Sequence, residues 1–296
     1  MAKLPTPRDP TLEAMKVEVE LALNHPPRGH LGASMIGDKC MRKLWYSFRW
    51  VSLTNFEFTT LSRFEDGHLS ENVMAQRLRM VRELDLHTHA EGGEQFRFTD
   101  FGGHFAGSAD GFVRGLLQAP KTPHIWEHKC VNEKKFAKLL KLKTEKGEKQ
   151  ALLEWDGIYY AQAQAYMHYF NMTRHYLTCA TPGTRDVTSV RTEYNASYAL
   201  SLVSKAQAII ASSEPPTRIT EKKDDWRCNF CGYKEQCHFG MLASENCRTC
   251  RFSQPVDGGW YCHHHKKMLD HERQRDGCKR FLPIEGLSTL TEEVAA

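Results

Sequence analysis

Residues 124–130, HIWEHKC, place a carboxylate and an ammonium group inside a run that otherwise predicts a buried strand. A strand-like stretch at 96–115, FRFTDFGGHFAGSADGFVRG, precedes this run and contains Asp110. Charged groups in a strand that faces a core cost free energy unless a partner compensates them. Side chains alternate along a strand with period two, so Glu127 and Lys129 share one face. We therefore expect Asp110, Glu127 and Lys129 to meet around a common partner.

Two carboxylates at adjacent strand ends are typical ligands of a hard divalent cation such as Mg²⁺ or Mn²⁺. Such a cation activates water and stabilises the charge that develops on a phosphodiester, and a nearby ammonium group can neutralise the same charge. A bare E-x-K is far more often an ordinary ion pair, so the interpretation depends on its surroundings. The helical pattern at 60–81 carries His68 and Glu71, and the one at 156–171 carries Gln162 and Tyr166, each pair on one helix face.

The segments GHLSE, GSADG, WEHK and QAQAY, in this order, resemble the motifs of the PD-(D/E)xK nuclease superfamily. The likeness is to its RecB-like branch, which includes phage exonucleases and CRISPR-associated RecB-like nucleases with an iron–sulfur cluster, and it runs from about residue 34 to residue 237. It implies an α/β fold: a restriction-endonuclease-like core with a mixed central sheet flanked by helices. The implied function is a metal-dependent DNA exonuclease that hydrolyses phosphodiester bonds from linear DNA ends, in phage or mobile-element recombination or repair. A structure-selective endonuclease and a non-catalytic nucleic-acid-binding protein are the alternatives.

The resemblance also implies roles for single residues. Asp110 and Glu127 would ligate Mg²⁺ or Mn²⁺, with the carbonyl of Cys130 and His68 as further ligands. Lys129 would be the catalytic lysine and Glu71 the helix carboxylate of the site, while Gln162 and Tyr166 would shape the site and contact DNA. The basic segment that follows the strand is expected either to contact phosphates or to form a solvated helix face; its candidate nucleic-acid-binding residues are Lys134, Lys135, Lys138 and Lys141.

Ten cysteines occur in the chain, and seven of them lie between Cys228 and Cys278. The spacing C-x2-C-x5-C at Cys228, Cys231 and Cys237 supplies three thiolates of a metal site, and Cys40 is the candidate for the fourth. One distant N-terminal cysteine followed by this spacing resembles the [4Fe–4S] site of CRISPR-associated RecB-like nucleases. Zn²⁺ in the same four thiolates is the alternative.

A second cysteine set follows, with C-x2-C at Cys247 and Cys250 and then Cys262 and Cys278. Its four thiolates suit a structural Zn²⁺, and a histidine of 263–265 could replace one of them. Because this segment is too small to form its own core, we expect a metal to hold it together as an appendage. Its basic and aromatic residues, Arg248 and Trp260 among them, could grip nucleic acid or form a solvated basic surface.

These patterns divide the chain into five parts: an N-terminal helical segment at 1–60 that contributes Cys40, the nuclease core at 61–212, the iron–sulfur or zinc segment at 213–240, a zinc-knuckle-like module at 241–283 and a disordered tail at 284–296. The net charge of +4 permits a single- or double-stranded DNA partner without requiring one. A single-strand annealing protein is a further expected partner, and an oligomer is allowed. With no signal peptide, no apolar run long enough to cross a membrane and many cysteines, we expect the cytoplasm of a bacterial or phage-infected cell, with no membrane partner.

Overall fold

The structure is a computed structural model that describes residues 8–24, 26–53 and 55–287. Its helices are α1 (Pro10–Leu23), α2 (Met41–Phe48), α3 (Phe58–Arg79), α4 (Glu133–Lys146), α5 (Glu148–Trp155), α6 (Gly157–Tyr169), α7 (Ala196–Ala211), α8 (Lys234–His238) and α9 (His271–Asp276). Its strands are β1 (Leu31–Gly32), β2 (Asp85–His87), β3 (Phe96–Asp100), β4 (Phe105–Ala109), β5 (Gly111–Arg114), β6 (His124–Cys130), β7 (Arg174–Ala180), β8 (Val187–Glu193), β9 (Ser253–Val256), β10 (Gly259–Cys262) and β11 (Lys267–Leu269).

The main sheet has five strands in the order β2-β5-β6-β7-β8. Strands β6 and β7 are parallel and the remaining pairs are antiparallel, so the sheet is mixed. Strand β6 lies in the centre, and its first five residues are buried, including the polar side chains of His124, Glu127 and His128. A parallel pair needs a crossover connection, and helices α4, α5 and α6 supply it between β6 and β7.

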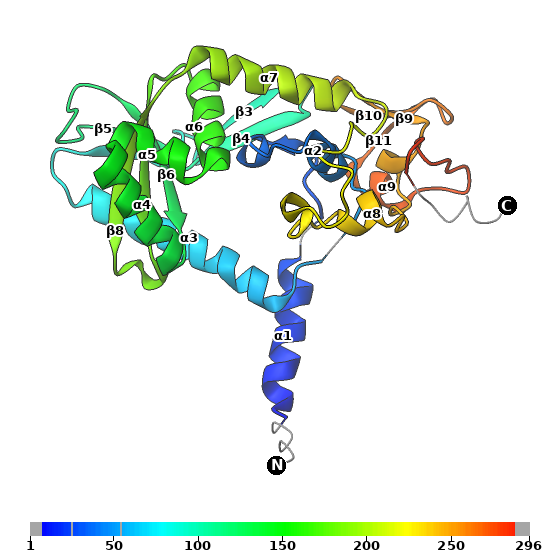
Figure 1. Ribbon diagram of the computed structural model, residues 1–296, viewed down its shortest axis with the longest axis horizontal. Helices are drawn as coiled ribbons and strands as arrows, with labels where there is room; N and C mark the ends of the chain where they lie inside the picture. The colour runs from blue at the N-terminus through cyan, green and yellow to red at the C-terminus, as the bar shows by residue number, and fades with distance from the viewer. Residues whose placement is uncertain (1–7, 25, 54, 288–296) are drawn as a thin grey trace.

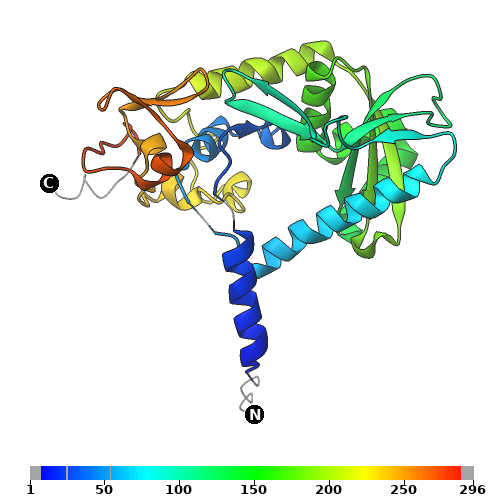
Figure 2. The same cartoon turned by 180° about the vertical axis from the view of Figure 1, so that it is seen from behind.

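Helices cover both faces of this sheet, as Figures 1 and 2 show. Helix α3 contacts β6 through the face that carries His128, and α6 approaches the opposite face, which carries Glu127. Helix α6 is almost entirely buried, and its alternating alanines Ala161, Ala163 and Ala165 let it pack closely. The predicted mixed α/β architecture, with mixed sheets flanked by helices, is confirmed.

The C-terminal segment is continuous with the main core and is not a separate appendage. The three-stranded sheet β11-β10-β9 belongs to this segment, whereas the sheet β1-β4-β3 is built from earlier parts of the chain. His104, beside β4, contacts the carbonyl of Val256 on β9 at 2.7 Å. One apolar cluster joins Leu44 and Trp45 of α2 to Trp260 and Leu269 of the C-terminal sheet. Apolar burial therefore helps to hold residues 241–283 in place, and the metal expected there stays a prediction.

The two ends of the described chain differ in their packing. Ile284 and Leu287, in the tail predicted to be disordered, are buried in the same core, and residues 288–296 lie outside the described part. Helix α1 begins at a cap formed by Asp9 and projects from the body with no buried residue (Figures 1 and 2). Within residues 8–24, 26–53 and 55–287, no helix has the length and apolar character needed to cross a membrane.

Candidate active site

Asp110, Glu127 and Lys129 meet where β5 and β6 lie side by side. Asp110 occupies the bend between β4 and β5, and its Oδ2 accepts a hydrogen bond of 2.8 Å from the backbone N–H of His128. Lys129 Nζ lies 2.6 Å from Glu127 Oε1, as expected for residues two apart on one strand face. The Glu127 side chain is only 4 % exposed, so this ion pair lies in the interior.

Helix α6 holds the Glu127 carboxylate from the other side. Gln162 Nε2 donates to Glu127 Oε1 at 2.9 Å and also lies 3.0 Å from the Tyr166 hydroxyl. Gly107 makes this approach possible, because a Cβ at that position would lie 2.6 Å from a carbon of the Tyr166 ring. The predicted pairing of Gln162 and Tyr166 on one helix face therefore has a physical basis, while their predicted roles toward DNA stay predictions.

The second carboxylate oxygen of Glu127, Oε2, is buried and has no hydrogen-bond partner within residues 8–24, 26–53 and 55–287. Burial, together with Asp110, raises the pKa of Glu127 to about 8, although Lys129 opposes the shift. Burial and Asp110 likewise raise the pKa of Glu71, on α3, to about 7. An unpartnered buried carboxylate oxygen among like charges is unfavourable, and a cation would relieve it.

The remaining predicted ligands lie at the edge of this cluster. His68 is exposed on α3. Burial raises the pKa of Asp110, and Lys129, the His128 backbone N–H and His68 oppose that shift. Cys130 ends β6. Within the described part of the chain, no group of three or more His, Cys, Asp or Glu side chains is arranged to hold a metal ion. Magnesium commonly takes only one or two protein carboxylates and keeps several waters, so Asp110 and Glu127 Oε2 fit such an ion.

Sequence reasoning missed the polar contacts beneath the site. His128, between Glu127 and Lys129, points to the opposite face, where its two ring nitrogens lie 2.8 Å from Ser70 Oγ and 2.9 Å from Thr178 Oγ1. Burial and Lys129 lower the pKa of His128 to about 4, so the imidazole is neutral at neutral pH. The alternation of side chains in EHK was the available signal, because it places the histidine away from the two charged groups.

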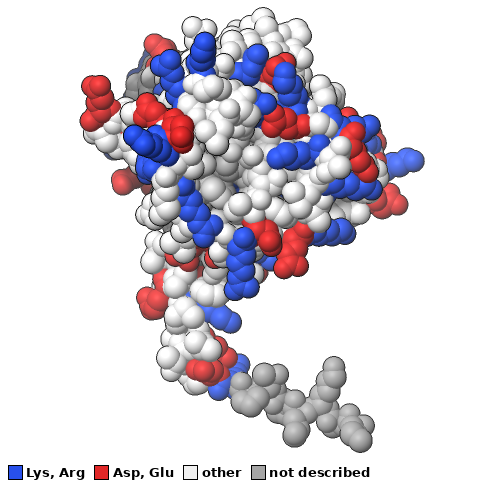
Figure 3. Space-filling view, turned by 90° about the vertical axis from the view of Figure 1, so that its left-hand side faces the viewer, with Lys and Arg blue, Asp and Glu red and all other residues white. Residues whose placement is uncertain are grey.

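The lysines after β6 are less free than predicted. Lys135 pairs with Asp156 at 2.7 Å, and Lys138 donates to the carbonyl of Trp155 at 3.1 Å, so both stabilise the α4–α5 pair. Lys141 lies 3.8 Å from Glu145 and remains mostly exposed, and Lys134 borders an open cavity of about 510 Å³. On the side of the molecule that Figure 3 shows, basic and acidic side chains are interspersed. The phosphate contacts of all four lysines stay predictions, and the ammonium groups of Lys134 and Lys141 are the freer ones.

The fold brings the first cysteine set to one place. Cys40, which precedes α2, lines the same cavity of about 20 Å³ as Cys228, Cys231 and Cys237. Cys40 and Cys237 both affect the pKa of Cys231, which burial raises. The long-range grouping predicted from spacing is therefore present, although the four thiols are not arranged to hold a metal ion as they stand.

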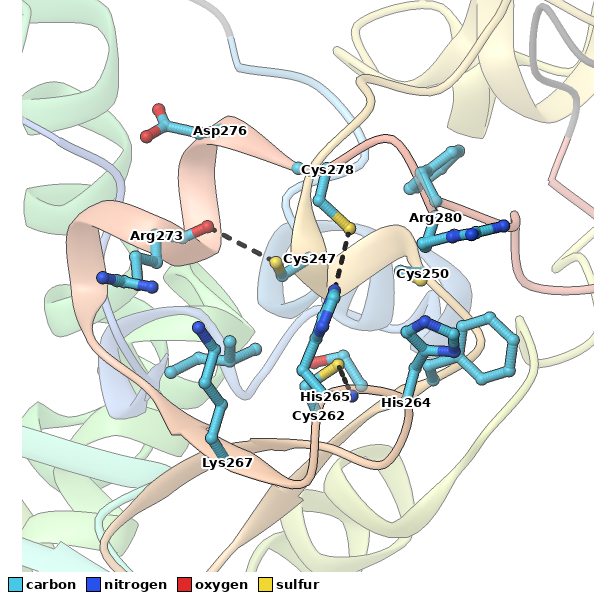
Figure 4. Close-up of a pocket in the computed structure, with 15 residues that line it drawn as sticks. Cys247, Cys250, Cys262, His264, His265, Lys267, Arg273, Asp276, Cys278 and Arg280 are labelled. Carbon is cyan, nitrogen blue, oxygen red and sulfur yellow. Dashed lines mark hydrogen bonds between the residues drawn. The ribbon is translucent and has the colours of Figure 1, made fainter.

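The second cysteine set lines a larger cavity of about 140 Å³, which Figure 4 shows. Burial and the other three thiols raise the pKa of Cys247 to about 11. His265 Nε2 lies 3.6 Å from Cys278 Sγ, and the His265 backbone N–H donates to Cys262 Sγ at 3.5 Å (Figure 4). His263 instead contacts Gln254 at 3.1 Å.

Arg248 and Trp260 do not contribute to a nucleic-acid surface. Each is only 1 % exposed, so the prediction that they could grip DNA is wrong. The reason is that Arg248 turns inward between Trp50 and Trp260, with its guanidinium carbon 3.7 Å and 4.6 Å from the two ring centroids.

No family model and no curated protein matches the chain. Among solved structures it is similar to an alkaline exonuclease from Laribacter hongkongensis, with a TM-score of 0.43 and 16% identity over 66% of this chain and 91% of that one. It is also similar to a phage-related exonuclease from Haemophilus somnus 129PT, with a TM-score of 0.41 and 12% identity over 64% of this chain and 94% of that one. At these scores and identities, the likeness does not assign the chain to a family.

Proposed function

We propose that the protein is a divalent-metal-dependent DNA exonuclease of the PD-(D/E)xK type and of its RecB-like branch, with a restriction-endonuclease-like core. The observation that carries this proposal is the buried, unpartnered Oε2 of Glu127 beside Asp110, Glu71 and Lys129. A structural ion pair would need only Glu127 and Lys129. A cluster in which burial and Asp110 raise the pKa of both Glu127 and Glu71 fits a cation site better.

In this proposal, some residues of the site bind the cation and others bind the DNA substrate. Asp110 and Glu127 would ligate Mg²⁺ or Mn²⁺, with His68 and the Cys130 carbonyl as additional donors. When bound, the cation would activate water and stabilise negative charge on the scissile phosphate. Burial lowers the pKa of Lys129, but Glu127 and Asp110 raise it by more, so Lys129 stays an ammonium group.

A permanently charged ammonium group cannot accept a proton from water, so Lys129 would act as a donor to the phosphate and not as a base. Gln162, braced by Tyr166, holds Glu127 in place without neutralising it. Lys134, Lys135, Lys138 and Lys141 would contact the DNA backbone, as cations on the helix that follows β6 can do.

Both cysteine sets are proposed as structural metal sites. A [4Fe–4S] cluster, or Zn²⁺ in its place, would bind Cys40, Cys228, Cys231 and Cys237, and Zn²⁺ would bind Cys247, Cys250, Cys262 and Cys278. Each set lines one cavity, which supports the grouping. Iron and zinc analysis of the purified protein, with the visible absorbance of an iron–sulfur cluster, tests this assignment; a folded protein that contains neither metal would refute it.

Free thiols in such number suit a reducing compartment, so we place the enzyme in the cytoplasm of a bacterial or phage-infected cell, in recombination or repair. A single-strand annealing protein is the proposed partner. Retention of such a protein on the immobilised enzyme at low salt tests the partnership, and no retention at any salt would contradict it.

The decisive experiment is digestion of end-labelled linear DNA with Mg²⁺ or Mn²⁺ by the natural protein, by Glu127→Ala and by Glu154→Ala. Glu154 is an exposed glutamate on α5 and serves as the matched control. We expect metal-dependent digestion that only Glu127→Ala abolishes, with DNA binding retained. Circular single-stranded DNA should resist, because it has no end; its cleavage would indicate an endonuclease. If neither DNA form is digested, the result would indicate a non-catalytic DNA-binding protein.

A further inference from the structure

Helix α3 carries Glu71 to the site and packs against the sheet through a narrow buried strip. Of its 22 residues, only Leu61, Ser70, Met74 and Ala75 are buried. Successive residues of an α-helix are about 100° apart around the axis, so a small rotation of α3 would turn Glu71 away from Asp110. Polar contacts help to hold this rotation. Arg77 and Arg79 donate to backbone carbonyls near the end of the helix, and Ser70 makes the buried polar contact next to Glu71.

A chain of buried hydrogen bonds links α3 to the strand that carries Glu127. Ser70 Oγ lies 2.8 Å from His128 Nε2, and His128 Nδ1 lies 2.9 Å from Thr178 Oγ1. The parallel register pairs His128 with Thr178 on adjacent strands. Trp126 Nε1 donates to Thr178 Oγ1 at 2.9 Å, and that hydroxyl lies 3.4 Å from the carbonyl of Glu127.

One assignment of protons satisfies all of these contacts. The Thr178 hydroxyl donates to the Glu127 carbonyl and accepts from Trp126 and from His128 Nδ1–H. His128 Nε2 then has no proton and accepts from the Ser70 hydroxyl. In this assignment each group donates to the next one along the chain of hydrogen bonds, which runs from α3 through β6 to β7.

We propose that Ser70 and His128 are positioning residues that set the rotation of α3 and thereby hold Glu71 against Asp110. Neither side chain lies on the face of the sheet that carries Glu127 and Lys129. Ser70 also contacts the Cys130 thiol at the end of β6, and the proposed effect passes through Glu71. Ser70 immediately precedes Glu71, and the backbone N–H of His128 also donates to Asp110 Oδ2. The two ends of the link thus adjoin the two carboxylates that it aligns. This inference rests on the proposed nuclease function.

Ser70→Ala tests the link, with Ser62→Ala as the matched control. Ser62 lies on the same helix, and its hydroxyl only donates back to the Phe58 carbonyl. We expect Ser70→Ala to lower kcat on linear DNA by about 10- to 100-fold, the usual effect of removing a partner that orients a site residue. KM should stay within about two-fold, because substrate contacts are intact. Ser62→Ala should behave like the natural protein.

A double-mutant cycle with Glu71→Gln separates positioning from a general structural role. If Ser70 acts through Glu71, Ser70→Ala should lower kcat in the natural background and have no further effect on Glu71→Gln. Equal effects in both backgrounds, or a Ser70→Ala enzyme as active as Ser62→Ala, would overturn the inference.

Ser70→Ala alone leaves the buried His128 ring without its partner and could destabilise the protein. The double variant Ser70→Ala/His128→Leu avoids this, because apolar groups replace both members of the hydrogen bond. This variant should remain folded and show the same loss of kcat; full activity would overturn the inference. An inactive natural protein would overturn the proposed function and this inference together, whereas an active protein indifferent to Ser70 would overturn this inference alone.

Discussion

Replacing Arg248 with alanine tests whether the C-terminal segment is part of the main core. The guanidinium group donates to the backbone carbonyls of Phe48 and Gly29, each at 3.0 Å, and to Gln274 Oε1 at 2.9 Å. Burial and Arg49 lower the pKa of Arg248 to about 9, so it remains charged at neutral pH. One side chain therefore ties three distant segments of the chain together.

The expected magnitude follows from these contacts. Removing the side chain leaves three acceptors without this donor, at roughly 1 kcal/mol or more each when buried. It also removes the stacking on Trp50 and leaves a cavity. A total loss of about 3–5 kcal/mol is consistent with such changes. For a chain of this size, each kcal/mol lowers Tm by about 2–4 °C, so we expect a fall of about 6–20 °C.

Thermal unfolding followed by circular dichroism measures this fall, with Arg251→Ala as the control. Arg251 lies three residues further along, is exposed, and should change Tm little. A Tm for Arg248→Ala equal to that of Arg251→Ala would refute the reasoning. If Arg248→Ala instead weakened DNA binding and left Tm unchanged, Arg248 would contact DNA at the surface, as the sequence suggested.

Three further predictions follow from single residues. Gly107→Ala should destabilise the protein by about 1–3 kcal/mol in urea unfolding, because its Cβ would overlap the Tyr166 ring; an unchanged midpoint would contradict this. Lys129→Met should lower kcat by about 100- to 1,000-fold while DNA binding persists, as expected for a lost charge-stabilising donor; near-normal kcat would show that Lys129 only pairs with its neighbour. Burial lowers the pKa of His175 to about 3. Above pH 6.5 His175 is neutral in both states, and below it the unfolded chain takes up a proton that the folded protein does not, so stability should fall by about 2 kcal/mol between pH 7 and pH 5. His175→Asn should lose this part of the acid sensitivity, and an unchanged pH dependence of its unfolding free energy would contradict the assignment.

Local patterns in the sequence were sufficient for much of the fold and the candidate site. The period-two alternation of HIWEHKC predicted that Glu127 and Lys129 share a face, and the i, i+4 spacing predicted the pairing of Gln162 with Tyr166. Both relations hold because they depend only on the geometry of one strand or one helix. The spacing of the first cysteine set, with Cys40 added, also predicted a grouping that the fold produces.

Which side chains from distant segments contact each other was decided by the tertiary structure alone. Arg248 and Lys135 looked like surface cations, yet one enters the core beside Trp50 and the other pairs with Asp156. Ser70 and His128 lie inside the segments GHLSE and WEHK, 58 positions apart, and no pattern along the chain shows that their side chains meet. Periodicity states which face of its own element a side chain occupies. Which neighbour covers that face, and whether a charge on it meets solvent, an acid or an aromatic ring, is set by how elements far apart in the chain pack together.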